Sequence, residues 1–470
     1  MYKRVMNICL LIVLCCLPLL TACSDGGWGH REGETFDFYA GPVIPMTFME
    51  SQADIIVSRN IDFNFSKYSE EYERGAIVRD TYELHNDSQA EITVTAAYPF
   101  VGSFNLQEMP IITAGQSEID YEIHAGAYTG GFTGGGGASS SLNLQDARSW
   151  NEYADLLEDG TYFTDAFSAL KSLEQPVVVY KLHDIVNRGE EADAATLCMQ
   201  LDYDSEKTML FTFGFNGGGT QEETGIEYRD FFLREWKDRP DGQVKYLIAL
   251  GQDLAGYTLQ GYQNGACLPG TELDGIEAEV TRVETTLGEA LRELSKIRYD
   301  AVIGDTNSGG AVDRYINEKV SFEQYYEQVI VHFLQNGPLS SNTKERYDFG
   351  LGAGRLDEFV SETISLKRIL YLTFDLTIPA GETLPLNVVQ LKPASCDYLC
   401  EEKGSQDLDG YDMTTVLGSN LRFRKQTASI SGYDAIKIVR QNFGFDLAAG
   451  STEAELALDE TRYYLEVRKK

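Results

Sequence analysis

The sequence LYLTFDLTIPAGETLPLNV, residues 370–388, indicates most directly what kind of fold the chain adopts. Apolar and polar residues alternate with a period of two over 370–378, which is typical of a half-buried β-strand. Residues 379–382 then supply the proline and glycine of a turn, and a second apolar series follows over 384–388. The segment therefore predicts two strands separated by a turn.

Similar alternation occurs towards both ends of the chain. The clearest apolar series are Ile61, Phe63 and Phe65; Ile92 to Tyr98; Ile119 to Ile123; Ile436 and Ile438; Phe443 and Phe445; and Tyr463 to Val467. Further β-rich runs cover residues 177–186, 197–203, 209–215 and 244–250. Strands at this density, with glycine-rich turns, predict a mainly β, α+β fold of antiparallel, Ig-like β-sandwich domains.

Two segments rich in turn-forming residues carry predictions of their own. The strand-like runs 76–84 and 91–98 are joined by His85-Asn86-Asp87-Ser88, and such a connection predicts an antiparallel hairpin. Gly217–Gly219 lacks a lysine at the offset that a phosphate-binding loop requires. We therefore expect an ordinary loop at these glycines.

Amphipathic patterns predict a helical hairpin over residues 283–337, packed on a sheet. One helical face of the first segment carries Val283, Leu287, Leu291, Leu294 and Ile297. Capping-box spacing is present in both segments, at Thr286 with Glu289 and at Ser321 with Gln324. Val320 and Tyr325 have the spacing of a hydrophobic staple, and Asn336-Gly337-Pro338 ends the second helix. One or two short helices are also expected over residues 142–173.

The length of the chain predicts more than one domain. Its 470 residues exceed what a single hydrophobic core usually holds. We expect an N-terminal β-rich domain with short helices over residues 47–275, a helical insertion over 276–345 and a C-terminal β-sandwich region over 346–470. Composition is that of a folded protein, with 43% apolar and 24% charged residues.

The charge of the chain argues against one class of partner. Its 39 basic and 73 acidic side chains give a net charge of −34. Phosphate backbones and anionic lipid head groups repel a protein of this charge. Nucleic acid is therefore not an expected partner.

The N-terminus has the pattern of an export signal. Lys3 and Arg4 precede an uncharged run over residues 7–20, which is too short to span a bilayer as a helix. Leu20-Thr21-Ala22-Cys23 follows and resembles the lipobox of bacterial lipoproteins. The resemblance implies that residues 1–22 are a signal peptide cleaved before Cys23, and that the sulfur of Cys23 carries diacylglycerol.

The same resemblance implies a location. Acyl chains at Cys23 would anchor the protein to the cell membrane, on its extracytoplasmic face. Residues 23–46 contain glycine and proline without periodicity, which suits a flexible tether. We expect the folded part to begin near Thr47.

Four cysteines lie beyond the lipobox: Cys198, Cys267, Cys396 and Cys400. In an extracytoplasmic protein, an even number of cysteines predicts up to two disulfides. A bond between Cys396 and Cys400 is favoured because so short a loop is easily closed, which leaves Cys198 and Cys267 as the other candidate pair. Zinc is not expected, since no histidine lies near Cys396 and Cys400.

One acidic segment has the spacing of a calcium loop. Asp407, Asp409 and Asp412 offer closely spaced carboxylates, and calcium takes six to eight oxygen ligands. The EF-hand pattern is incomplete, because Val416 stands where its final glutamate belongs. A solvated acidic loop is the alternative interpretation. No other cofactor is expected.

Three functions are compatible with these observations. The first is a lipid-anchored, non-catalytic protein that binds or scaffolds a glycan or protein of the bacterial cell envelope. The second is an envelope hydrolase that acts on glycan or peptide, because paired carboxylates far apart in sequence cannot be recognised. The third is the solute-capture lipoprotein of an importer, which would need two lobes that close around a ligand. Motif searches favour the first function, since neither a serine-hydrolase elbow nor a zinc-protease motif is present.

Overall fold

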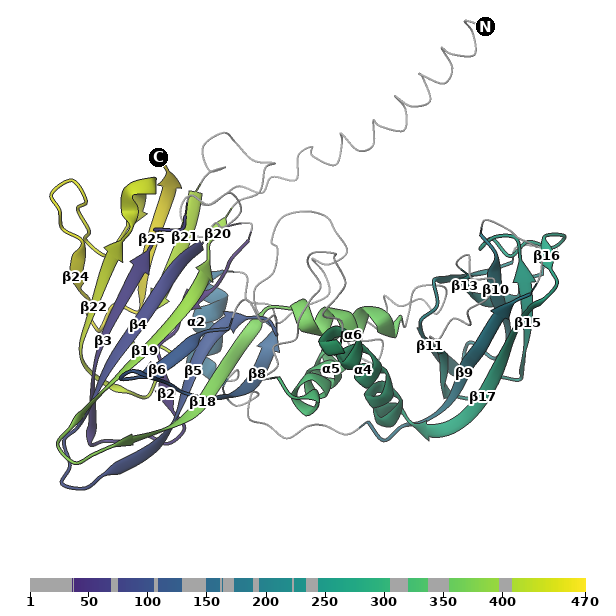
Figure 1. The fold of residues 1–470 in the computed structure, drawn as a ribbon, viewed down its shortest axis with the longest axis horizontal. Coiled ribbons are helices and arrows are strands. Elements are labelled where there is room, and N and C mark those ends of the chain that lie inside the picture. Colours follow the sequence, from purple (N-terminus) through teal and green to yellow (C-terminus); the bar gives the residue numbers. More distant parts are fainter. Residues whose placement is uncertain are drawn as a thin grey trace, which may run out of the picture.

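The computed structural model describes most of the chain beyond residue 35 (Figure 1). The described residues are 36, 38–68, 75–104, 109–128, 149–160, 163, 173–188, 194–221, 224–233, 244–304, 320–336, 355–396 and 408–470. Strands dominate this part of the chain and form five sheets, most of whose neighbours are antiparallel. The predicted mainly β, α+β class with sandwich architecture is confirmed.

A large sandwich forms one end of the molecule (Figure 1). Its seven-stranded sheet has the order β24-β22-β3-β4-β19-β6-β7. The bounds are β3 Ile55–Asn64, β4 Gly75–Asn86, β6 Ile111–Ala114, β7 Ser117–Glu118, β19 Thr383–Pro393, β22 Arg422–Ser431 and β24 Glu453–Glu455. Strands β3 and β22 run parallel to each other, whereas the other neighbours in this sheet are antiparallel.

Two further sheets pack against this long sheet. The four-stranded sheet β2-β5-β18-β8 comprises β2 Thr47–Phe48, β5 Ile92–Gly102, β8 Glu122–Tyr128 and β18 Arg368–Ile378. The sheet β1-β21-β25-β23 comprises β1 Pro42–Val43, β21 Leu408–Thr414, β23 Ile436–Gln441 and β25 Arg462–Lys469, with β20 Ser395–Cys396 also paired to β21. Each of these two sheets encloses a separate apolar core together with the long sheet. The inward side chains at one end of β3 and β4 pack against one sheet, and those at the other end pack against the other.

A smaller sandwich forms the other end of the molecule. One of its sheets, in the order β12-β13-β10-β15-β16, comprises β10 Thr196–Asp202, β12 Gly217–Thr220, β13 Glu227–Phe232, β15 Gly256–Tyr262 and β16 Glu272–Leu273. The other, in the order β11-β14-β9-β17, comprises β9 Pro176–Asn187, β11 Thr208–Phe213, β14 Lys245–Gly251 and β17 Ile276–Thr286. Buried apolar side chains from both sheets, including Leu182, Leu197 and Leu247, form the core between them.

Three helices lie between the two sandwiches (Figure 1). They are α4 Leu287–Gly304, α5 Phe322–Asn336 and α6 Leu356–Ser365. Both predicted capping boxes form: Glu289 N donates to Thr286 Oγ1 (3.2 Å), and Ser321 exchanges hydrogen bonds with Gln324 (2.9 and 3.2 Å). The predicted helical hairpin, α4 with α5, packs on the sheet that contains β9 and β14.

Some details of the helical region differ from the prediction. Val283 belongs to β17 rather than to the helix, because Thr286 caps the helix only after it. Ile297 is 39% exposed although it follows the apolar period. Helix α6 was not predicted at all. Two smaller helical elements are α2 Trp150–Asp159, within the region where short helices were expected, and the 3₁₀ helix η3 Tyr433–Ala435.

The predicted hairpin of 76–84 with 91–98 is wrong. Strand β4 pairs with β3 and β19, whereas β5 pairs with β2 and β18, so the turn crosses between two facing sheets. The turn over 379–382 makes the same crossing between β18 and β19. Apolar alternation does not distinguish these arrangements, because both bury the same face of each strand.

The pairing of strands divides the chain differently from the predicted domains. Strands β3 to β8 share sheets with β18 to β25, so the two ends of the chain form one sandwich. Among the described residues, strands β9 to β17 pair with no strand outside this group, and Thr212 of β11 adds one isolated bridge to Arg355. Boundaries at 275 and 346 therefore do not follow the sheets, because distant segments of a chain can pair as well as neighbours do.

The predicted tether is too long. Residues 38–46 pack in the large sandwich, where Tyr39, Val43, Ile44 and Met46 are each at most 2% exposed. Gly41 has a φ of +72°, and a Cβ there would lie 2.7 Å from the hydroxyl of Tyr153. Glycine is thus required by a close packing contact, and not by flexibility.

The expectation of a loop at Gly217–Gly219 is also wrong, since these glycines lie in β12. A Cβ at Gly218 would lie 2.7 Å from the carbonyl oxygen of Tyr228, on the paired strand β13. Glycine therefore allows close approach within the sheet.

Within the described residues, we find no helix with the length and apolar character needed to cross a membrane.

Candidate functional site

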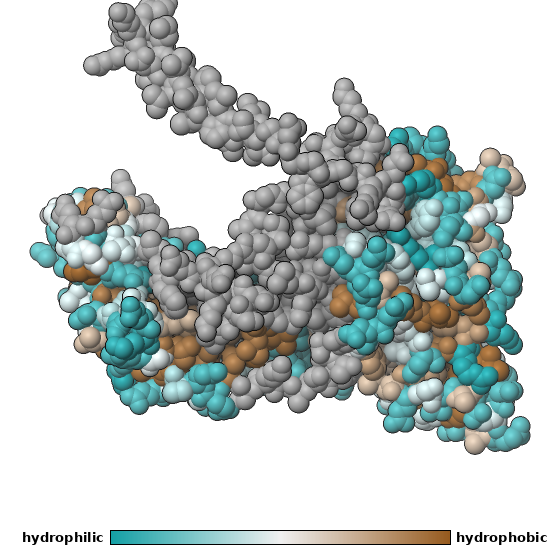
Figure 2. Space-filling view, turned by 180° about the vertical axis from the view of Figure 1, so that it is seen from behind, coloured by the Kyte–Doolittle hydropathy of each residue, from teal (hydrophilic) through white to brown (hydrophobic). Residues whose placement is uncertain are grey.

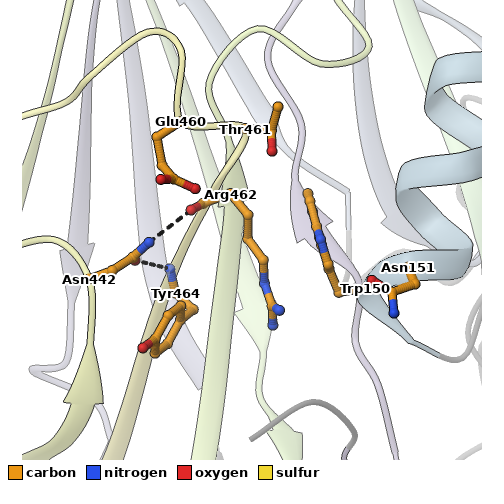
Figure 3. Close-up of a pocket in the computed structure, with 7 residues that line it drawn as sticks. All are labelled: Trp150, Asn151, Asn442, Glu460, Thr461, Arg462 and Tyr464. Atoms are coloured by element: carbon orange, nitrogen blue, oxygen red, sulfur yellow. Dashed lines mark hydrogen bonds between the residues drawn. The ribbon is translucent and has the colours of Figure 1, made fainter.

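A polar hollow of about 310 Å³ opens between the start of α2 and the start of β25 (Figure 3). Its lining residues come from three segments that are distant in sequence: Trp150, Asn151, Asn442, Glu460, Thr461, Arg462 and Tyr464. Two aromatic rings and several hydrogen-bonding groups thus face one space. A small set of polar groups beside rings is typical of a ligand site.

The guanidinium group of Arg462 lies between the two rings of the hollow (Figure 3). Its Cζ is 5.1 Å from the centroid of Trp150 and 5.6 Å from that of Tyr464. Both contacts have the geometry of cation–π interactions. The three side chains therefore hold one another in a fixed stack.

The buried carboxylate of Asp412 holds the guanidinium group of Arg462 in position. Nη2 of Arg462 donates to both oxygens of Asp412, at 3.0 and 3.2 Å, and Asp412 is only 6% exposed. The hydroxyl of Tyr39 donates to the same carboxylate. Burial, followed by the charge of Asp412, raises the pKa of Tyr39 well above its ordinary value, so this phenol remains a donor.

Asn442 fixes the main chain at the edge of the hollow. Its Nδ2 donates to the carbonyl of Arg462 (2.9 Å), and its Oδ1 accepts from the main-chain N–H of Tyr464 (2.8 Å) (Figure 3). The start of β25 is therefore held by side-chain as well as strand hydrogen bonds. A binding site gains affinity when such groups are ordered before the ligand arrives.

Local sequence explains why Trp150 is placed here. Ser149 caps α2 by accepting from Glu152 N (3.4 Å), so Trp150 is the first helical residue. Tyr153 and Leu157, one and two turns later, are buried against the outer face of the β5–β18 pair. The buried face of α2 thus directs Trp150 towards β25.

A second hollow of about 710 Å³ lies on the same sheet, and Tyr464 lines both. Tyr433, Val439 and Arg440 contribute to its lining. Val439 is 44% exposed and lies on β23, at the edge of the sheet. The ring of Tyr464 therefore separates two neighbouring concave surfaces.

Two buried carboxylates lie on this sheet face, and both are paired with arginine. Glu466 accepts from Arg440 at 2.6 and 2.8 Å, much as Asp412 accepts from Arg462. Burial raises the pKa of Glu466, whereas the hydrogen bonds from Arg440 oppose that shift. Neither carboxylate lines either of these two hollows.

The predicted calcium ligands do not come together in the described structure. Asp409 and Asp412 are three residues apart on β21, so their side chains leave opposite faces of the strand. Asp409 accepts from Tyr68, on the face that carries Tyr411, whereas Asp412 accepts from Arg462. These two carboxylates cannot ligate one ion. Asp407 lies outside the described residues.

A different group has donor atoms close enough for a metal ion. One atom each from His183, Asp184 and Glu279 lie within 4.8 Å of one another, where β9 pairs with β17 at a bulge. Nδ1 of His183 is 2.7 Å from Asp184, and Nε2 is 2.8 Å from Thr281 Oγ1. Sequence reasoning missed this group because it depends on strand register.

The remaining sequence-predicted site residues are the cysteines. Cys198 and Cys267 are both 0% exposed and lie in one small cluster. Cys396 lies in β20, and its predicted partner Cys400 is outside the described residues. Cys23 is also outside the described residues, as is the whole lipobox.

Sequence reasoning found none of the residues that line the hollow. A signal for part of it exists, because Ser149 and Glu152 have capping-box spacing and mark Trp150 as the start of a helix. The partners of Trp150 lie more than 290 positions later in the chain, and no periodic pattern connects them.

Comparison with known proteins does not assign the chain to a family. No protein-family model matches its sequence, and no curated protein matches it either.

Proposed function

We propose that this chain is a lipid-anchored, extracytoplasmic protein of the bacterial cell envelope that binds a neutral glycan without catalysis. The observation that carries the proposal is the stack of Trp150, Arg462 and Tyr464 in the wall of a polar hollow. The N-terminal sequence, with its lipobox at Cys23, supports the location.

The chemistry of the hollow suits a sugar. A pyranose ring has apolar C–H faces, which pack on aromatic rings, and hydroxyls that both donate and accept hydrogen bonds. Trp150 and Tyr464 offer ring surface, while Asn151, Glu460 and Thr461 are exposed and offer donors and acceptors. A binding site with rings on one side and short polar groups on the other can satisfy both aspects of a sugar.

Charge favours a neutral ligand over an anionic one. The positive charge of Arg462 is offset by Asp412 at 3.0 Å, and Glu460 adds a further negative charge. The chain as a whole carries −34, which repels anions at longer range. Hydrophilic side chains are spread over both β units on the face shown in Figure 2.

The hydrolase alternative receives less support from this sheet face. Its buried carboxylates, Asp412 and Glu466, are each held in an ion pair with arginine and line neither hollow. A glycosidase needs one carboxylic acid that can release its proton to the leaving group. Binding alone requires no such group.

The proposal is tested by titrating the purified protein with neutral oligosaccharides of glucose, mannose, xylose and N-acetylglucosamine, using isothermal calorimetry. We expect saturable binding to at least one series, and at least a tenfold weaker affinity for W150A and for Y464A. Y257A is the matched control, because Tyr257 is an exposed tyrosine, at 39%, on the other sandwich.

Two results would refute glycan binding at this site. One is the absence of saturable binding to every series. The other is unchanged affinity in both W150A and Y464A. Trp150 also packs against the apolar cluster that α2 forms with β5 and β18. The melting temperature of each variant is therefore measured in parallel. Y464A, whose ring is partly exposed, keeps the test valid if W150A does not fold.

A further inference from the structure

The smaller sandwich brings two distant cysteines into contact. Cys198 lies on β10, the central strand of its sheet, which pairs with β13 on one side and β15 on the other. Cys267 lies in the loop between β15 and β16. The two side chains share one small buried cluster with Tyr262, and Tyr228 packs against it.

The loop holds Cys267 in place through its main chain. Nε2 of Gln221 donates to the carbonyl of Cys267 (2.7 Å), and Cys267 N donates to the carbonyl of Asn264 (3.2 Å). Its φ of +48° is in the left-handed region, which is uncommon for a residue other than glycine. The surrounding structure thus fixes the direction in which this thiol points.

We propose that Cys198 and Cys267 form a disulfide in the exported protein. The inference rests on the extracytoplasmic location in the proposed function, but not on glycan binding. Structural disulfides form and persist in oxidising compartments outside the cytoplasm. Within the described residues, Cys198 and Cys267 are the one pair of cysteines that share a buried cluster, and both are free thiols in the structure.

The oxidant would be a disulfide-bonded protein or small molecule of the thiol–disulfide exchange class. The thiolate of one cysteine attacks the disulfide of the oxidant and forms a mixed disulfide, which releases one thiol. The second cysteine, as its thiolate, then attacks the mixed disulfide and forms the Cys198–Cys267 bond. The oxidant leaves as two thiols, which take up the two protons that the cysteines lose.

Burial determines when this exchange takes place. Both side chains are 0% exposed, so a bulky oxidant cannot reach either sulfur in the folded protein. The contact with Cys267 and burial also raise the pKa of Cys198, which disfavours the reactive thiolate after folding. Oxidation therefore belongs to the unfolded chain as it is exported, and the completed bond is shielded from reductants.

The experiment maps thiols in the full-length protein, produced with its own N-terminus and extracted from the membrane fraction. Free thiols are alkylated in denaturant before and after reduction, and peptides are identified by mass spectrometry. We expect a linked Cys198–Cys267 peptide, with neither residue alkylated before reduction. C396S is the matched control and should leave that peptide unchanged.

The bond should also stabilise the protein. Reduction in denaturant and refolding under reductant should lower the melting temperature by roughly 10 °C, since the bond closes a long loop. C198A and C267A should each show the same loss, and reductant should lower neither any further.

The outcomes separate the disulfide from the location. Alkylation of both cysteines before reduction, in protein whose Cys23 is acylated, would overturn the disulfide but not the anchor. If the protein is instead cytoplasmic and unacylated, the proposed location fails. The unfolded chain is then refolded with oxidised glutathione: the Cys198–Cys267 peptide supports the pairing, and any other pairing overturns it.

Discussion

A buried ion pair marks the place where the long sheet changes partners. Nε and Nη2 of Arg59 donate to the carboxylate of Asp80 at 2.7 and 2.9 Å, and both side chains are fully buried. On β3, Val57 belongs to one apolar core and Ile61 to the other, with Arg59 between them. Arg59 also donates to the carbonyl of Thr414 (2.8 Å), at the end of β21.

Removing the charge of Asp80 should destabilise the large sandwich strongly. D80N would leave the guanidinium of Arg59 buried without its counter-ion, which costs about 3–5 kcal/mol of unfolding free energy in comparable buried pairs. The measurement is urea-induced unfolding followed by circular dichroism. D375N is the control, because Asp375 is exposed and bonds only to Thr95 among the described residues (2.6 Å), and it should cost less than ~1 kcal/mol. Equal losses in the two variants would show that the buried pair contributes nothing specific.

The two crossings between the facing sheets of the large sandwich are joined by one asparagine. Asn86 ends β4, and its Nδ2 donates to the carbonyls of Ala90 (2.8 Å) and Ile378 (2.9 Å). Its main chain also bonds to the turn after β18, through Gly381 N and the carbonyl of Glu382. A residue that looks like a simple turn former in sequence therefore links two connections between the facing sheets, from β4 to β5 and from β18 to β19.

The substitution N86A should destabilise both of these connections at once. It would leave the carbonyl of buried Ile378 without this donor, which costs roughly 1–3 kcal/mol, whereas the carbonyl of exposed Ala90 still accepts from Ser88 Oγ (2.8 Å). We expect a loss of unfolding free energy of about 1–3 kcal/mol, measured by thermal and urea denaturation. N60A provides the comparison, since exposed Asn60 bonds to Thr427 Oγ1 (2.7 Å) on the surface. The linking role fails if N86A is no less stable than N60A.

Helix α5 connects the two β units of the molecule. Tyr325 and Val329 belong to the core of the large sandwich, whereas Tyr326 and Ile330 belong to the core beside the smaller one. Adjacent residues of an α-helix point roughly 100° apart, so two neighbouring stripes of α5 can pack in two different cores. Any loss of order in α5 should therefore destabilise both sandwiches.

Acid should weaken this connection through His332 on α5. Burial lowers the pKa of His332 below 6.5, although the carboxylate of Glu362, 3.4 Å away, opposes the shift. The unfolded chain therefore takes up a proton near pH 6.5 that the folded chain does not, so stability falls as pH drops below that value. The loss of unfolding free energy can reach about 1.4 kcal/mol per pH unit.

The measurement compares melting curves of the wild type and H332Q between pH 7 and 5. H332Q cannot titrate, so its stability should fall less steeply, and the difference between the two isolates His332 from the carboxylates. E362Q removes the carboxylate that opposes the lowering of the His332 pKa. The stability of this variant should therefore continue to fall to a lower pH than that of the wild type. Parallel curves for wild type and H332Q would mean that His332 does not titrate on unfolding.

Local patterns predicted the elements of this fold well. The alternation at Ile61, Phe63 and Phe65 marks side chains that are fully buried, and the capping boxes of α4 and α5 form as expected. These predictions succeeded because strand periodicity and helix caps depend on residues only a few positions apart. The same reasoning missed α6 and assigned residues 38–46 to a tether.

The amino-acid sequence alone was sufficient for the class of fold and most strand positions, and it is the basis for the proposed anchor at Cys23. It could not settle whether β4 pairs with β5 or crosses to the facing sheet, because apolar alternation is the same in both. Nor could it show that Trp150 meets Arg462, or Cys198 meets Cys267, since those contacts join segments far apart in the chain. Such contacts follow from the packing of whole sheets and helices, which no short window of sequence contains.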